Sequence, residues 1–215
     1  DMGEVKRLQY FCQGKFLDSA TDKYMDIYNP STGEVIAQTP CCTESEVLQA
    51  VQAADQAYPA WRNTPPAKRQ QVFLKLRQLL EEHETELTDL IAREHGKVWK
   101  EAAGDLEKAK EPTEYAGSIA HHLMGESLMD TSHGIDTVMY HEPLGVFAGI
   151  APFNFPAMIP MGWMAPLAIA TGNTFVLKAS STTPLTSYRF AELYQEAGLP
   201  DGVLNVVTCS RKEAE

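Results

Sequence analysis

Two polar side chains, Asn154 and Lys178, each follow a hydrophobic run that has the pattern of a buried strand, 146–151 and 175–177 respectively. The carboxyl ends of strands in open α/β sheets are where ligands bind. An asparagine amide at such an end can donate to a developing oxyanion, and a lysine can hold a ribose or a phosphate. The same residues could also be a loop asparagine and a solvated strand-end lysine, so the pattern alone leaves both interpretations open.

The stretch 144–180 must place these two side chains, and its pattern predicts a strand, a turn, a helix and a second strand. Pro156 suits the first turn of the helix, because its fixed φ and missing N–H cost nothing there. Gly172 is placed to end the helix, expected to stop near Ala170, in a left-handed conformation. Both strands are expected to be buried on both faces of a parallel sheet. The unit is therefore a right-handed βαβ crossover.

Within residues 10–40 the sequence predicts short strands at 16–17, 24–28 and 35–39, and helices follow them. The sequence Thr43-Glu44-Ser45-Glu46 is a capping box, which marks the start of the first helix. A second helix is expected from Thr64-Pro65, with a break near His83 and an end at Gly96.

A third helical stretch is expected from Val98, and Pro112 inside it should kink or split the helix. Residues 124–142 predict an extended arm, with strands at 128–129 and 137–140 and a turn at 132–134. Beyond the stretch 144–180, the sequence predicts a helix that begins at Pro184, a third strand of the same sheet over 203–207, and another helix.

Composition narrows the class of protein. The chain has 215 residues, 44% hydrophobic and 22% charged, as in soluble globular proteins. Its formal net charge of −11 argues against nucleic acid and against anionic membrane surfaces as partners. Since neither an uninterrupted membrane-length apolar run nor a signal peptide is visible, we expect a cytoplasmic protein without a membrane anchor.

The cysteines and histidines do not indicate a metal site. Cys12, Cys41, Cys42 and Cys209 lack the spacing of metal ligands, and adjacent cysteines rarely bridge each other. We therefore expect reduced thiols. The neighbours His121-His122 should point to different sides of a helix, so a shared metal ion is not expected.

The motifs APFNFP at 151–156 and GNTFVLK at 172–178 resemble the aldehyde dehydrogenase superfamily. Similar features run from 29–33, with the sequence NPSTG, to Val207, which covers nearly the whole chain. The sequence IAPFNFPAMIP, with APLAIATGNTF after it, is most similar to the methylmalonate- or malonate-semialdehyde dehydrogenase branch.

This resemblance implies an α/β fold with a helical N-terminal region, a protruding β-hairpin arm and the start of a doubly wound parallel sheet. Residues 1–123 would be the N-terminal strands and helices of the cofactor-binding domain. Residues 124–143 would be a hairpin arm that packs against a partner subunit in a homo-oligomer, a dimer or a tetramer. Residues 144–215 would be the first half of the dinucleotide-binding sheet. The catalytic domain, with its nucleophilic cysteine and the glutamate of hydrolytic members, would lie beyond Glu215.

The resemblance also implies an activity, the oxidation of a small aldehyde or semialdehyde through a thiohemiacetal on a cysteine. NAD would be the main cofactor, NADP a permitted one, and coenzyme A the acyl acceptor if the enzyme is of the acylating type. None of the four cysteines of this chain would be the nucleophile, so these 215 residues alone are expected to be inactive. The alternative is a catalytically silent relative, or a fragment, that acts as a binding or oligomerisation module.

Individual site residues follow from the motifs. Asn154 matches the asparagine that donates to the aldehyde oxygen, and Lys178 matches the lysine that bonds the adenosine ribose. Ser181 stands where many NAD-using members have glutamate, and Thr182 is beside it. The expected cofactor-binding residues are Ile150, Ala151, Pro152, Phe153, Lys178, Ser181 and Thr182.

The chain departs from the family pattern at three places. One extra residue, near Gly162, lies between Asn154 and Lys178, and Ala179 stands where proline is common. Lys108 appears where the semialdehyde branch offers an arginine to the substrate carboxylate. A lysine can still pair with that carboxylate, but as a point charge without the bidentate fork.

Overall fold

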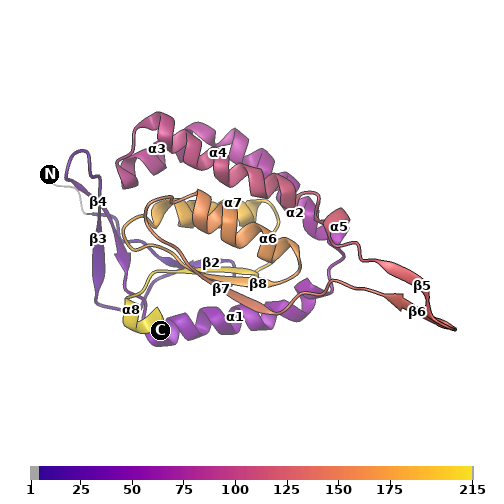
Figure 1. Ribbon diagram of the computed structural model, residues 1–215. Coiled ribbons are helices and arrows are strands. Elements are labelled where there is room, and N and C mark those ends of the chain that lie inside the picture. The colour runs from indigo at the N-terminus through magenta and orange to yellow at the C-terminus, as the bar shows by residue number, and fades with distance from the viewer. Residues whose placement is uncertain (1–4, 215) are drawn as a thin grey trace.

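The computed structural model describes residues 5–214. Residues 1–4 of the expected segment 1–123 and Glu215 of the expected segment 144–215 lie outside the described part. Figure 1 shows a central sheet between helices: α1 (Glu44–Arg62) covers one face, and α6 (Ala165–Ala170) and α7 (Leu185–Glu196) cover the other. A further helical layer, α2 to α4, packs outside α6 and α7. The expected α/β architecture with helices on both faces of the sheet is thus confirmed.

The central sheet has five strands in the order β2-β1-β9-β8-β7. Their bounds are β1 Tyr10–Cys12, β2 Lys15–Leu17, β7 Val146–Ile150, β8 Thr174–Lys178 and β9 Leu204–Val207. The last three are parallel, as the predicted βαβ crossovers require. The antiparallel hairpin of β1 and β2 joins this sheet beside β9, so the sheet is mixed. The sequence predicted the strand at 16–17, but neither β1 nor the place of this hairpin in the sheet.

The burial predicted for the first parallel strand is wrong. In β7, Val146 is 36% and Ile150 is 62% exposed, whereas β8 is almost completely buried. The reason is position: β7 is the edge strand of the described sheet, and the side that carries Val146, Ala148 and Ile150 is open. An apolar run shows that a strand favours burial, but it does not show which segment provides the cover.

The helices begin and end largely where the sequence predicts. Beyond those named above, they are α2 (Pro66–Glu82), α3 (Glu84–His95), α4 (Trp99–Ala116), α5 (Ile119–His122), a π-helix η1 (Met158–Met164) and α8 (Arg211–Ala214). The capping box at the start of α1 is present, with the Thr43 amide donating to Glu46 Oε2 at 2.7 Å. Gly96 ends α3 with φ of 83°. The expected split at Pro112 is absent, because α4 continues through it.

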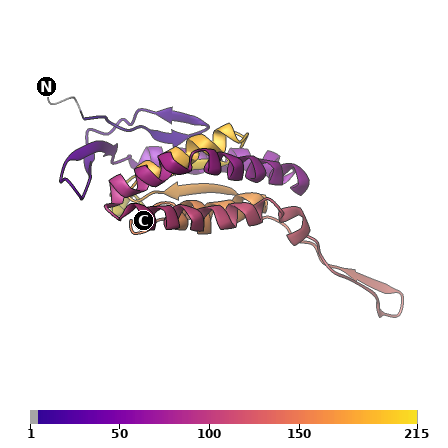
Figure 2. The same cartoon turned by 90° about the horizontal axis from the view of Figure 1, so that it is seen from above.

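Two antiparallel hairpins lie outside the central sheet. β3 (Tyr24–Tyr28) pairs with β4 (Val35–Pro40). β5 (Ser127–Ser132) pairs with β6 (Ile135–Val138) in an arm that projects far from the body in Figures 1 and 2. Every residue of β5 and β6 is exposed. The predicted arm is therefore confirmed, although its second strand begins two residues earlier than expected.

One hydrophobic core joins the helical layers to the sheet, with Phe73 and Leu106 in the same cluster as Phe175. Buried polar groups reinforce this contact: Trp61 Nε1 donates to the Ile169 carbonyl at 2.9 Å. The helix α6, which connects the two site-bearing strands, is thereby fixed against α1 by a side-chain hydrogen bond as well as by apolar packing.

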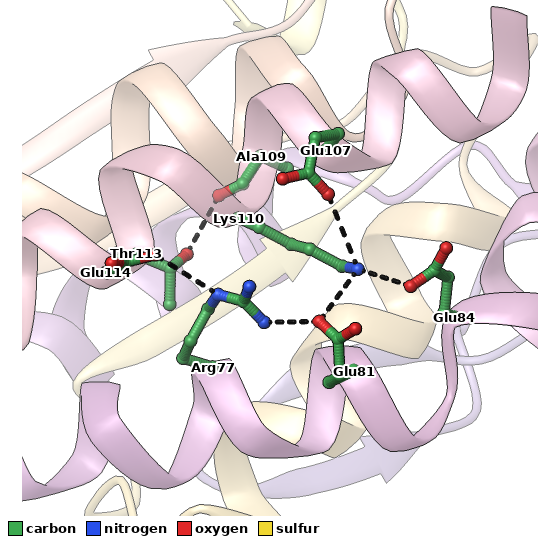
Figure 3. Close-up of polar contacts among 8 residues, drawn as sticks. All are labelled: Arg77, Glu81, Glu84, Glu107, Ala109, Lys110, Thr113 and Glu114. Carbon is green, nitrogen blue, oxygen red and sulfur yellow. Dashed lines mark hydrogen bonds and ion pairs between the residues drawn. The ribbon is translucent and has the colours of Figure 1, made fainter.

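An ionic cluster around the buried Lys110 side chain links α2, α3 and α4 (Figure 3). The Lys110 side chain is 2% exposed, and its Nζ lies 2.7 Å from Glu84 Oε2, 3.1 Å from Glu81 Oε2 and 3.6 Å from Glu107 Oε2. Arg77 also donates to Glu81, at 2.6 Å. Burial alone would lower the pKa of Lys110, but its hydrogen bonds with Glu84 and Glu81, and their charges, raise it above its ordinary value.

We predict that Lys110→Met lowers the free energy of unfolding by about 1–2 kcal/mol. The loss is moderate because the carboxylates are half exposed and regain water when the ammonium is removed. Urea denaturation of the chain and the variant measures it. A variant as stable as the original chain would show that the apolar methionine replaces the whole cluster at no cost.

Candidate active site

The three parallel strands end together at one edge of the sheet. Ile150 on β7 is opposite Lys178 on β8, and Lys178 is opposite Val207 on β9. Backbone hydrogen bonds continue the register one step further, from Ala151 N to the Lys178 carbonyl at 3.1 Å and from Ala179 N to the Val207 carbonyl at 2.9 Å. The loop that carries Asn154 and the loop that follows Lys178 therefore begin side by side at the carboxyl edge, as the sequence predicts.

The side chains of the first loop are exposed, and its backbone is held by residues outside the loop. Pro152, Phe153, Asn154 and Phe155 are exposed. Their backbone is held from outside the loop: Thr183 Oγ1 donates to the Phe153 carbonyl at 3.2 Å, and Lys97 Nζ donates to the Asn154 carbonyl at 3.1 Å. Within residues 5–214 the side-chain amide of Asn154 makes no hydrogen bond. It is a free donor on a held backbone, as an oxyanion site requires.

The second loop offers a cation and hydroxyl groups. Lys178 is half-buried at the end of β8, and Ser181 is half-buried beyond it, while Thr182 is exposed. The Thr182 amide donates to Ser180 Oγ at 3.2 Å, which shapes the turn between them. These groups can bind ribose hydroxyls or a phosphate, and they lie on the same edge as Ile150 to Phe153. A hollow of about 400 Å³ elsewhere, lined by residues that include Arg7, Glu86 and Arg189, contains none of these groups.

The segment near Gly162, where the sequence predicts an extra residue, is a wider helix. Met158–Met164 forms a π-helix, whose turn holds more residues than an α-helical turn. Gly162 lies within it and packs against α4, so closely that an added Cβ would be 2.9 Å from Ala109 Cα and 3.2 Å from the Lys108 carbonyl oxygen. Pro112 has no N–H to donate to that carbonyl. The glycine thus allows a close helix–helix approach that any side chain would obstruct.

Lys108 itself lies on α4, outside the two edge loops. Its Nζ is 2.7 Å from Glu111 Oε1, one turn away, and both side chains are more than half exposed. The role of Lys108 toward a substrate carboxylate stays a prediction, because nothing in the described chain connects its ammonium to Asn154.

Three of the four cysteines are poor nucleophiles in this fold. All four are free, as expected, and three are buried: Cys12, Cys42 and Cys209. Burial raises the pKa of Cys12 to about 11 and that of Cys42 to about 12. Burial also raises the pKa of Cys209, although the nearby positive charge of Lys178 opposes the shift. Since the thiolate is the reactive form, these three thiols are inert at neutral pH.

Three charged residues at this site were not found by sequence reasoning: Glu94, Lys97 and Asp105. Glu94, at the end of α3, is 1% exposed and binds the start of α7. Its carboxylate accepts the Leu185 amide at 2.8 Å, the Thr186 amide at 2.9 Å and the Thr186 hydroxyl. In the sequence, Glu94 and Lys97 lie on either side of Gly96, and Asp105 follows nine residues after it. This placement suggests nothing about partners distant in the chain.

Two further kinds of site are absent from the part of the chain that the structure describes. Residues 5–214 contain no cluster of three or more histidine, cysteine, aspartate or glutamate side chains that could hold a metal ion. No helix in the same range is both long and apolar enough to cross a membrane.

Glu94 predicts a pH dependence of stability. Burial raises its pKa to about 7, although the hydrogen bonds from Thr186 and Leu185 act in the opposite direction. In the unfolded chain the group titrates near its ordinary pKa of about 4.3. The folded state therefore keeps a proton that the unfolded state loses, and this contribution to stability, up to about 3–4 kcal/mol, disappears as the pH rises through 7.

We expect the free energy of unfolding of the original chain, relative to Glu94→Gln, to fall between about pH 5 and about pH 7.5. Urea denaturation of both proteins at each pH measures this difference, and titrations shared by both proteins cancel. An equal difference at the two pH values would contradict the prediction.

Comparison with known proteins agrees with the geometry. The aldehyde dehydrogenase family matches residues 16–215. The malonate-semialdehyde dehydrogenase of Lacticaseibacillus casei is 45% identical over 203 residues, which cover 94% of this chain and 41% of that protein.

Solved structures show the same relationship. The crystal structure of methylmalonate-semialdehyde dehydrogenase from Oceanimonas doudoroffii superposes on this chain with a TM-score of 0.94 at 41% identity. The superposition covers 98% of this chain and 43% of that chain. A Sinorhizobium meliloti structure, described as a methylmalonate-semialdehyde dehydrogenase complexed with NAD, has a TM-score of 0.94 at 40% identity, with coverage of 99% and 43%. The chain thus spans about two fifths of the length of these relatives. It belongs to the aldehyde dehydrogenase family.

Proposed function

We propose that this chain is the N-terminal part of an NAD(P)-dependent aldehyde dehydrogenase that oxidises a small aldehyde or semialdehyde. The observation that carries this proposal is the common edge of β7 and β8, where Asn154 presents an unbonded amide beside the loop that follows Lys178. A hydrogen-bond donor and a ribose- or phosphate-binding cation then lie at the same carboxyl edge, as oxidation of an aldehyde by a dinucleotide requires.

In this proposal Asn154 is the catalytic residue of the chain. Its amide donates to the aldehyde oxygen and to the oxyanion that forms when a cysteine thiolate adds to the carbonyl carbon. The cysteine would belong to the remainder of the longer protein, as the family resemblance implies, and the three buried thiols of this chain are protonated at neutral pH. The Asn154 amide is available to the substrate because it has no hydrogen-bond partner among the described residues. Its backbone is held in place by the hydrogen bond from Lys97.

The cofactor proposal rests on the second loop and on a relative complexed with NAD. Lys178 would hold the adenosine ribose, with Ser181 and Thr182 beside it, and residues 150–153 would flank the nicotinamide end. When bound, the dinucleotide accepts the hydride that leaves the substrate carbon. The groups present fit such a ligand, since the Lys178 ammonium and the hydroxyls of Ser181 and Thr182 lie at the carboxyl edge of the sheet. The loop 179–183 contains no carboxylate that would repel a phosphate.

The proposed substrate and acyl acceptor follow from the similarity to semialdehyde dehydrogenases. Relatives named malonate- and methylmalonate-semialdehyde dehydrogenases indicate a semialdehyde whose carboxylate Lys108 would pair with. Coenzyme A would accept the acyl group in an acylating enzyme. Among residues 5–214 the exposed Lys108 ammonium is bonded only to Glu111, and it can exchange that partner for a substrate carboxylate at little cost.

We also propose a domain organisation and a partner. Residues 1–123 and 144–215 would belong to the cofactor-binding domain, and residues 124–143 would be an arm that packs on a second copy of the chain. In support, the arm projects from the body and exposes Leu128, Met129 and Ile135. Exposed apolar side chains on a hairpin favour a protein partner. The location proposed for the homo-oligomer is the cytoplasm.

Expression of the 215-residue chain and of the complete open reading frame that contains it tests the proposal. The complete protein should reduce NAD in the presence of malonate semialdehyde or methylmalonate semialdehyde, and the 215-residue chain should not, because it lacks the nucleophile. The chain should also self-associate through its open sheet edge and apolar surface. Turnover by the chain alone would refute the proposal that the nucleophile lies outside these 215 residues. An inactive complete protein would favour the alternative of a non-catalytic module.

Asn154→Ala in the complete protein should lower kcat by about 10²–10³, the usual cost of one oxyanion donor. The KM for the cofactor should stay nearly constant, because the amide faces the reacting carbonyl. Steady-state kinetics measure both. A kcat within about threefold of the unaltered protein, well under 1 kcal/mol, would make Asn154 an ordinary loop residue.

Ser181→Glu in the complete protein should shift the ratio of kcat/KM at least tenfold toward NAD and against NADP, about 1.4 kcal/mol. A glutamate at this position accepts hydrogen bonds from both ribose hydroxyls and repels a 2′-phosphate, whereas serine leaves Lys178 free to attract it. The unaltered protein should use both cofactors, with NAD preferred. An unchanged ratio would remove Ser181 from the cofactor site.

A further inference from the structure

A buried ion pair contacts the Asn154 loop at both of its ends. Lys97 follows α3, and Asp105 lies in the second turn of α4. Their side chains are 7% and 0% exposed, and Lys97 Nζ is 3.1 Å from Asp105 Oδ2. Lys97 Nζ also donates to the Asn154 carbonyl at 3.1 Å, while Asp105 Oδ1 accepts the Met158 amide at 2.8 Å. One pair of side chains thus bonds the first and last residues of the segment 154–158.

The sequence of this segment explains why its backbone needs outside partners. Pro152 and Pro156 have no N–H, so the loop cannot complete a regular pattern of its own. Met158 begins η1, where the first amides of a helix lack partners within the helix, and the negative charge of Asp105 caps that end. Lys97 Nζ additionally lies 4.4 Å from the centre of the Phe155 ring.

From these contacts we propose that Lys97 and Asp105 are positioning residues, which set the direction of the Asn154 side-chain amide. This role rests on the proposed function of Asn154. The carbonyl of Asn154 is fixed by the ammonium, and the following helix is fixed by the carboxylate, so the Cα–Cβ bond between these two anchors has one direction. The amide then meets the aldehyde oxygen without first paying for the ordering of the loop.

Stability alone does not account for this arrangement. A fully buried ion pair contributes little net stability, because the loss of hydration offsets the attraction between the charges. What distinguishes the pair is where its remaining hydrogen bonds go: both end on the backbone of the five residues that include Asn154. Lys110 provides the comparison, since it is equally buried and lies on the same helix as Asp105, but it bonds half-exposed carboxylates distant from the loop.

The test uses the complete protein and two variants, Lys97→Met and, as the matched control, Lys110→Met. At a temperature where both remain folded, Lys97→Met should lower kcat by about 10- to 100-fold with an unchanged KM for NAD, because a displacement of about 1 Å at a reacting group costs up to 10²-fold. Lys110→Met should lower the midpoint of thermal unfolding but leave kcat within about twofold of the unaltered protein, under 0.5 kcal/mol.

A double-mutant cycle separates positioning from general damage. If Lys97 acts through Asn154, adding Lys97→Met to Asn154→Ala should change kcat less than about threefold, because the group that it orients is already gone. Independent, additive losses would overturn the inference, and so would equal kcat values for Lys97→Met and Lys110→Met.

A second measurement does not depend on catalysis. Asp105→Asn should accelerate hydrogen exchange of the Met158 amide at least tenfold, because a neutral amide accepts its hydrogen bond more weakly and no longer holds Lys97. Unchanged exchange overturns the inference while leaving the proposed function intact. A complete protein that oxidises no aldehyde would instead overturn the proposed function, and this positioning role with it.

Discussion

The site depends on the parallel register of β7 and β8. Because Ile150 pairs with Lys178, the chain leaves both strands at the same level of the sheet, and the two loops that could bind substrate and cofactor start as neighbours. The register is maintained by backbone hydrogen bonds and by the side chains of β8, which are buried on both faces of the sheet. A slip of one residue would move Phe175 and Leu177 out of one hydrophobic cluster and Val176 out of the other. The chemistry proposed for Asn154 and Lys178 is therefore a consequence of strand pairing more than of either loop.

Much of this could be predicted from the sequence because its causes are local. The capping box at Thr43, the break at His83, the left-handed end at Gly96 and the order of strands and helices all depend on residues a few positions apart. The site edge was predictable for a related reason: parallel strands joined by one crossover must present their carboxyl ends together. The apolar runs on either side of Asn154 were enough to place it there.

What the sequence could not show depends on contacts between distant segments. The exposure of Ile150 follows from the place of β7 at the sheet edge, and the pairing of Phe11 with Val206 joins residues from opposite ends of the chain. The difference in spacing near Gly162 was visible in the sequence, but the π-helix there and its close approach to α4 were not. Periodicity carries no information about any of these.

In the proposed arrangement, the helix α4 serves both stability and function with similar residues. Lys110 joins carboxylates on α2 and α3 that water still reaches, so its energy is that of a partly solvated cluster. Asp105, fewer than two turns earlier, is completely buried and bonds a cation and a backbone amide near Asn154. A loop rich in proline cannot hold itself by regular hydrogen bonds, so its rigidity must come from such side chains. Buried charge close to a free polar donor is thus a sign of positioning, whereas buried charge among half-exposed partners is a sign of packing.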